Sequence, residues 1–114
     1  MSTTTPAVRR FTPGGESGPV RFGDRRIVIA PAVEAAEGGP LSTYSAFFGA
    51  GERADLPAPY DEVWVVIRGH IVVAGAGRTV SAVAGDHLHV PRDSPGVVEA
   101  IEESELVCIS VPAH

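Results

Sequence analysis

Short apolar runs alternate with glycine and proline along the whole chain. The runs are rich in Val, Ile, Thr, Tyr and Phe, and 13 glycines and 10 prolines fall between them at short intervals. Such runs, bounded by turn residues, are typical of β-strands. The pattern predicts strands at residues 20–22, 26–30, 41–48, 62–67, 70–74, 79–83, 87–90, 96–101 and 105–111.

Helix signals are weak, whereas turn signals recur at regular intervals. Only residues 32–38 tolerate a helix, and this stretch ends at Gly39-Pro40. Arg68-Gly69 and Gly75-Ala76-Gly77-Arg78 are interpreted as hairpin connections. Turns about 8–12 residues apart are expected of a sandwich or barrel. The sequence therefore predicts an all-β fold, with an N-terminal arm at 1–25 and one barrel domain at 26–114.

The predicted strand at 62–67 has two unlike faces, because side chains alternate along a strand. One face holds Glu62, Trp64, Val66 and Arg68, and the other holds Val63, Val65 and Ile67. The mixed face would meet solvent in a sandwich and line a cavity in a barrel. Tryptophan is highly buried on average, so we favour the cavity. The aliphatic face suits sheet packing or an apolar patch between two subunits.

Two histidines supply further candidate chemistry. His87 and His89 share one strand face, about 6.5–7 Å apart. Such a pair can assist Glu62 in proton transfer, or can bind a divalent metal together with Glu62. The simpler interpretation, partly exposed or hydrogen-bonded histidines, carries more weight, and no cofactor is the main expectation. His114, the last residue, is expected to be mobile.

Composition narrows the classes of function. The formal net charge is −5 and the basic residues are scattered, which argues against nucleic acid or an anionic membrane as a partner. No apolar stretch approaches the ~18–20 residues of a membrane span, and the polar N-terminus lacks the apolar run of a signal peptide. A cytoplasmic protein is expected. The single cysteine, Cys108, cannot form an internal disulfide and is expected to be packed. Lysine, asparagine and glutamine are absent, which suggests a GC-rich bacterial genome.

Two motifs resemble a known family. Glu62 and Gly69, followed after fifteen residues by Gly85-Asp86-His87-Leu88-His89-Val90-Pro91, resemble the two signature motifs of the cupins. Within the cupins, the sequence is most similar to the branch that contains the ethanolamine-utilisation Q protein. The similarity lies in the segments Tyr60-Asp61-Glu62-Val63, Gly77-Arg78-Thr79-Val80 and Ala84-Gly85-Asp86. The resemblance covers about residues 41–112 and implies a double-stranded β-helix, or jelly-roll, barrel around a central cavity.

The chain also departs from the cupin motifs. Asp55-Leu56-Pro57-Ala58 stands where the first motif has His-x-His, and the second motif continues without its histidine. Of the usual metal ligands only Glu62 remains, so the resemblance implies that the ordinary cupin metal site is absent. The resemblance implies an acetate-kinase activity for the similar branch, but we expect this chain to lack that branch's additional N-terminal region and to be unsuited to ATP.

The sequence thus favours a metal-independent enzyme of the lyase or isomerase type, with several alternatives open. Its reaction would be isomerisation, dehydration, cyclisation or decarboxylation of a small metabolite. Glu62, His89 and His87 are the candidate catalytic residues, and Tyr60, Trp64, Val66, Arg68 and Tyr44 are candidates for substrate contact. The alternatives are a non-catalytic binding module, a microcompartment protein of the ethanolamine-utilisation type, and an atypical metal enzyme using Glu62, His87 and His89. A homodimer is expected.

Overall fold

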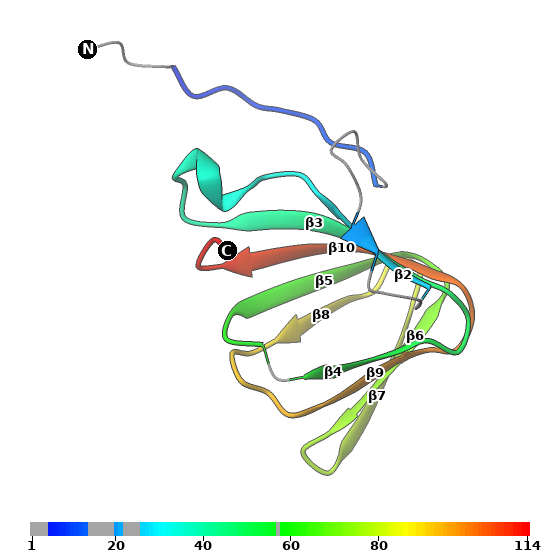
Figure 1. Cartoon of the computed structure of the whole chain (residues 1–114). Coiled ribbons are helices and arrows are strands. Elements are labelled where there is room, and N and C mark those ends of the chain that lie inside the picture. Colours follow the sequence, from blue (N-terminus) through cyan, green and yellow to red (C-terminus); the bar gives the residue numbers. More distant parts are fainter. Residues whose placement is uncertain (1–4, 14–19, 22–25, 57) are drawn as a thin grey trace.

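Ten strands and one short helix make up the computed structural model, which describes residues 5–13, 20–21, 26–56 and 58–114 (Figure 1). The strands are β1 (Val20–Arg21), β2 (Ile27–Pro31), β3 (Ser42–Phe48), β4 (Arg53–Leu56), β5 (Asp61–Arg68), β6 (His70–Gly75), β7 (Arg78–Val83), β8 (His87–Val90), β9 (Gly96–Ala100) and β10 (Ser104–Val111). The helix is η1 (Ala35–Glu37), a single 3₁₀ turn within the stretch expected to tolerate one. The all-β prediction is confirmed.

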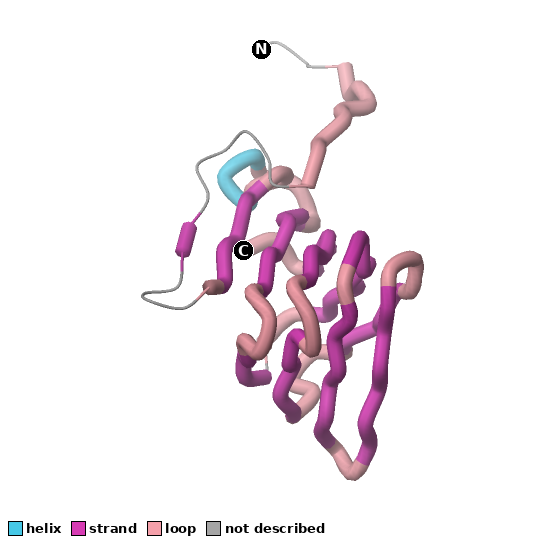
Figure 2. The backbone as a smooth tube through the Cα atoms, turned by 90° about the vertical axis from the view of Figure 1, so that its right-hand side faces the viewer, coloured by secondary structure: helices cyan, strands magenta, loops and turns pink. Residues whose placement is uncertain are grey.

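The strands form two antiparallel sheets. One has the order β1-β2-β3-β10-β5-β8 and the other the order β4-β9-β6-β7. Turned by 90°, the molecule shows η1 near one end and the tip of the β6–β7 hairpin at the other (Figure 2). Among the described residues, no helix is long and apolar enough to cross a membrane.

One predicted hairpin is confirmed and one is wrong. β6 and β7 pair with Gly75 opposite Arg78, so that Ala76 and Gly77 form a two-residue loop with φ of 53° and 72°. Gly69, in contrast, carries the chain from β5 in one sheet to β6 in the other. It has a φ of 94°, and a Cβ there would collide with Ser104, so this crossover requires glycine.

The core fills the space between the sheets. Its buried members come from both sheets: Ile27, Ala46, Phe48, Trp64, Val66, Ile71, Ala82, Val90, Val98, Ala100, Leu106 and Cys108. Along β10 the even-numbered residues from Ser104 to Ser110 are buried and the intervening ones are less so. Each fully buried large aliphatic side chain contributes about 1.5–3 kcal/mol. The sheets are therefore held together by their facing apolar side chains.

β5 has the two faces that its sequence predicts. Glu62, Trp64 and Val66 are buried between the sheets, whereas Val63 and Ile67 are 37% and 41% exposed on the outside. Arg68 does not continue the inner face. The β5–β10 register shifts near Glu105, and this irregularity ends the alternation before Arg68. The homodimer, for which the outer apolar residues were a candidate surface, stays a prediction.

The predicted arm is partly described. Val20–Arg21 pair with β2 at the edge of the six-stranded sheet. Residues 5–12 are exposed, and residues 5–13 run away from the sheets (Figure 1). The division at residue 25 stays a prediction, and the last residues of the predicted arm lie outside the described residues.

Candidate functional site

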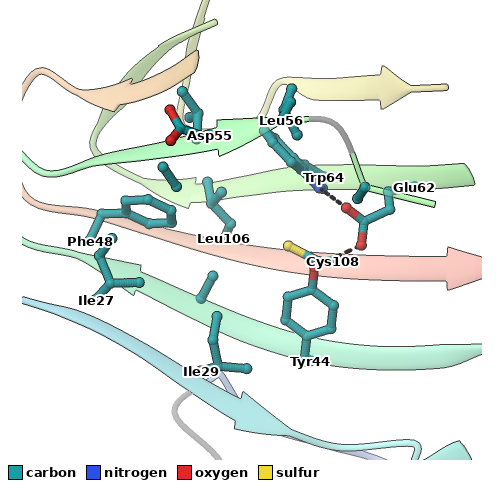
Figure 3. Close-up of a pocket in the computed structure, with 14 residues that line it drawn as sticks. Ile27, Ile29, Tyr44, Phe48, Asp55, Leu56, Glu62, Trp64, Leu106 and Cys108 are labelled. Atoms are coloured by element: carbon teal, nitrogen blue, oxygen red, sulfur yellow. Dashed lines mark hydrogen bonds between the residues drawn. The ribbon is translucent and has the colours of Figure 1, made fainter. Parts of the chain in front are cut away.

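A cavity of about 280 Å³ lies between the two sheets and has mostly apolar walls (Figure 3). It is lined by Ile27, Ile29, Tyr44, Ala46, Phe48, Ala54, Asp55, Leu56, Ala58, Glu62, Trp64, Val98, Leu106 and Cys108. We call it the acid cavity, because the carboxyl group of Glu62 forms part of its wall. Glu62 is only 4% exposed, which is unusual for a glutamate and calls for hydrogen-bonding partners.

Three side chains donate hydrogen bonds to Glu62. The Tyr44 hydroxyl lies 2.7 Å from Oε2, and the Ser110 hydroxyl also donates to Oε2. The Trp64 Nε1–H lies 3.2 Å from Oε1. Figure 3 shows the carboxyl group between Trp64 and Tyr44, with Cys108 beside it. No buried side-chain nitrogen or oxygen of the described residues lacks a partner.

Strand register brings these five side chains together. Cys108 in β10 lies opposite Tyr44 in β3 on one side and opposite Trp64 in β5 on the other. Ser110 lies opposite Glu62, one inward position further along. Because inward positions recur every second residue, the five form two adjacent rows across three neighbouring strands.

The hydrogen bonds also fix how the carboxyl group can act. An indole N–H can only donate, so Oε1 is an acceptor. A carboxylate oxygen has two acceptor positions, so Oε1 has one left beside its bond to Trp64. Burial, followed by the neighbouring Cys108 and Glu62, raises the pKa of the Tyr44 phenol. Tyr44 therefore keeps its proton and remains a donor to Glu62.

The cysteine in the cavity wall is protonated as well. Cys108 is buried, as expected from the sequence. Burial, with a further contribution from nearby Glu62, raises the pKa of its thiol. The thiolate is the nucleophilic form, so this thiol is unsuited to attack.

The two predicted catalytic histidines lie on the opposite side of the sheet. His89 and His87 pair with the outward-facing Val63 and Val65 and are exposed. The intervening Leu88 and the following Val90 point inward instead. Neither histidine reaches Glu62, and the predicted set of three metal ligands does not assemble. Among the described residues, no group of three or more His, Cys, Asp or Glu is placed to hold a metal ion.

The five predicted substrate-contact residues separate in the structure. Tyr44 and Trp64 line the acid cavity, whereas Val66 is buried in the core without lining it. Arg68 lies outside, with its guanidinium 3.4 Å from Glu103. Tyr60 is half-buried and is not among the cavity residues that the structure describes. The wrong placement of Arg68 follows from the irregularity in the β5–β10 pairing.

The C-terminal residue is held in place, contrary to expectation. The ring of His114 stacks on Tyr60 at 3.6 Å between centroids, and its edge approaches Tyr44. Its backbone N–H donates to the Ser42 hydroxyl at 2.8 Å.

Sequence reasoning also missed Ser110, whose hydroxyl donates a hydrogen bond to Glu62. Its inward parity on the strand beside Glu62 was the signal that could have found it.

A second hollow opens beside β7 and β8. Its volume is about 370 Å³, and its walls include Val80, Leu88 and Pro95. Arg78 and His89 are also among its lining residues, and both are exposed. We call it the open cavity.

The chain has the fold of the cupins, in which two antiparallel sheets face each other around a cavity. An RmlC-like cupin from Shewanella frigidimarina NCIMB 400 has the same fold, with a TM-score of 0.76 at 17% identity over 94% of each chain. Ectoine synthase from P. lautus has a TM-score of 0.72 at 15% identity, over 80% of this chain and 67% of that one. These likenesses show the fold alone.

Within the cupins, the chain belongs to the family of the ethanolamine utilisation protein EutQ. The family model matches residues 53–114, which is more than half of the chain. The structure of an ethanolamine utilization protein Q from Salmonella typhimurium LT2 is similar, with a TM-score of 0.71 at 20% identity over 77% of this chain and 71% of that one. The search of curated proteins gave no match.

Proposed function

We propose that this cupin binds a small metabolite in the acid cavity and moves a proton of that metabolite through Glu62. The observation that carries the proposal is the buried Glu62 carboxyl group, held by three donors in the wall of a mostly apolar cavity. A general base needs a fixed position and an acceptor for the substrate proton. The three hydrogen bonds hold Glu62 in place, and Oε1 has one acceptor position left.

The reaction follows from what Glu62 can accept and return. Oε1 takes a proton from a substrate carbon next to an electron-withdrawing group, and the C–H electron pair stays in the substrate. The protonated Glu62 then returns the proton to another carbon, which isomerises the substrate, or to a departing hydroxyl, which dehydrates it. General acid–base catalysis of this kind contributes about 10²–10⁴-fold to a rate. Tyr44 and Ser110 act as positioning residues, because they orient the carboxyl group through Oε2.

The surroundings of Glu62 do not fit the metal ion that many cupins hold. Its neighbours are a phenol, a serine hydroxyl and an indole, all of which donate to the carboxylate. Imidazoles would be the expected co-ligands, and His87 and His89 face away from the cavity. The proposal therefore routes no step through a metal. Ectoine synthase, on the same fold, supports the idea that such a barrel can house an enzyme.

The test uses solvent deuterium, because it does not require a known substrate. A bacterial polar metabolite extract is incubated with the protein in D₂O and analysed by mass spectrometry. A base that removes a C–H proton, exchanges it with D₂O and returns a deuteron to carbon leaves deuterium in its substrate or product. A dehydration shows instead as a product lighter than its substrate by one water. We expect labelled ions with wild type and with Glu99→Gln, an outer-sheet control, and at least about a hundredfold slower labelling with Glu62→Gln. Equal labelling by Glu62→Gln would remove Glu62 from the mechanism.

The second candidate function is non-catalytic binding within ethanolamine utilisation. It is supported by the family match over residues 53–114. A binding protein would be stabilised by components of the extract without labelling any of them. If it is a microcompartment protein, its gene should also lie beside genes for shell proteins.

A further inference from the structure

The charges in the wall of the acid cavity all have one sign. Its lining includes the carboxyl groups of Glu62 and Asp55, and no arginine or histidine of the described residues lines it. Lysine is absent from the whole chain. The two other titratable side chains in the wall, Tyr44 and Cys108, are neutral because their protons are retained. A ligand entering this cavity therefore meets negative charge and no compensating cation.

Two arginines that neighbour wall residues in the sequence are engaged on the outside. Arg53, in β4, lies 3.2 Å from Glu99, and the guanidinium of Arg26 donates to the backbone oxygen of Ala50. Neither is among the residues of the cavity wall. A carboxylate or phosphate ligand would have to give up its hydration beside Glu62 without gaining a positive partner, which disfavours binding strongly. Anionic metabolites are thus the class that the cavity excludes.

A cationic ligand would be attracted by the negative charge that disfavours binding of an anion. Glu62 has hydrogen-bond donors around it but no ion pair within the described part of the chain. An ammonium group in the cavity would supply the missing opposite charge. Coulomb attraction acts over several ångströms in a site of low dielectric, so the cation need not occupy the remaining acceptor position of Oε1. That position stays free for a reacting C–H group.

The rest of the wall indicates the size and character of the ligand. Ile29, Phe48, Leu56 and Leu106 offer aliphatic and aromatic contact. A volume of about 280 Å³ lies at the small end of ligand cavities, which commonly span ~300–1,000 Å³. The occupant is thus smaller than a typical drug and has an apolar body.

We infer that the ligand of the acid cavity is a small organic cation, an amine with a short apolar body, whose positive charge lies beside Glu62. This inference rests on the proposed function, in that it takes the acid cavity to be the substrate site. It adds the chemical class of the substrate, which the proton-transfer proposal leaves open.

The test compares three probes with one carbon skeleton: 3-methylbutylamine, 3-methylbutan-1-ol and 3-methylbutanoate. Binding to the wild-type protein at pH 7 is measured by NMR titration. We expect the amine to bind at least about tenfold more tightly than the carboxylate, with the alcohol between them. A carboxylate that binds as well as the amine, or failure of all three probes to bind, would overturn the inference. This comparison needs no variant.

Variants then locate the cation. Glu62→Gln should weaken amine binding at least about tenfold and change alcohol binding by less than about threefold. Asp55→Asn should weaken amine binding less, because Asp55 is exposed. Glu99→Gln is the control and should leave all three affinities unchanged. Unchanged amine affinity in Glu62→Gln would overturn the placement.

Failure of this inference and failure of the proposed function give different results. Glu62-dependent deuterium labelling of an anionic metabolite would preserve the proton-transfer proposal and overturn the cation. Glu62-dependent amine binding, with neither labelling nor dehydration of any extract component, would preserve the cation and overturn catalysis.

Discussion

The acid cavity and the open cavity differ less in volume than in how far their polar side chains are exposed to water. The open cavity is the larger, at about 370 Å³ against about 280 Å³. Its lining residues Arg78 and His89 are exposed to water, so solvent and salt screen the charge of Arg78. In the acid cavity Glu62 is 4% exposed and has three fixed donors.

This contrast shows that cavity size does not decide where chemistry can occur. A carboxyl group removed from water interacts more strongly with whatever enters beside it, because the local dielectric is low. The side chain of His89, in contrast, is 67% exposed, so water screens its interaction with any ligand. We therefore assign function to the smaller hollow, and the following predictions set the two against each other.

The largest expected difference concerns packing around the two hollows. Leu106 is 1% exposed beside the acid cavity, whereas Leu88 is half-buried beside the open cavity. Leu106→Ala should lower the free energy of unfolding by about 2–5 kcal/mol, since it removes buried methyl groups and leaves a void. Leu88→Ala should cost clearly less, because part of its surface already meets water. Urea unfolding of both variants measures this, and equal losses would contradict the contrast.

The sequence predicts the fold well because strand signals are local. Nine of the ten strands follow from apolar runs and turn residues. β4 was missed because it is short and two of its four residues, Arg53 and Asp55, are charged. The cavity role of Glu62 and Trp64 also follows from local alternation, together with the burial that tryptophan favours.

The composition of the site could be predicted only in part, because it depends on register. Ser110 lies 48 positions from Glu62 in the chain, and Tyr44 lies 18 positions from it. Their meeting requires β3, β10 and β5 to lie side by side, which no local pattern specifies. His87 and His89 were correctly placed on one face of a strand, but alternation alone cannot tell which face is inward.

An intermediate effect is expected at alkaline pH, and it distinguishes the acid cavity from the open cavity. Burial raises the pKa of Cys108 and of Tyr44 above their ordinary values of 9.0 and 10.0. Above pH 9 the unfolded chain releases a thiol proton that the folded protein keeps, so the unfolded state binds fewer protons and stability falls as pH rises. Each fully titrating group gives a slope of about 1.4 kcal/mol per pH unit. The walls of the open cavity contain no thiol or phenol among the described residues and add nothing.

Urea unfolding between pH 7 and 10.5 measures this slope. Cys108→Ala should remove the part that begins near pH 9, and Tyr44→Phe should remove the part that begins near pH 10. The matched variant Leu88→Ala, at the open cavity, should shift the whole curve without changing its slope. A wild-type stability that stays level from pH 8 to pH 10.5 would show that these two groups ionise as freely in the folded protein as in the unfolded chain.

The smallest effect is expected for the two outer histidines, and it matters because the sequence predicts that they act together with Glu62. His87 is exposed, and the ring of His89 lies 3.9 Å from Asp61 in a contact open to solvent. Exchanging both for alanine should change the free energy of unfolding by less than about 0.5 kcal/mol. It should also leave Glu62-dependent deuterium labelling and amine binding at the wild-type level, because both side chains lie on the far side of the sheet. A tenfold loss of labelling in this stable double variant would mean that the reacting groups lie outside the acid cavity, and the assignment of function to the buried carboxyl group would then fail.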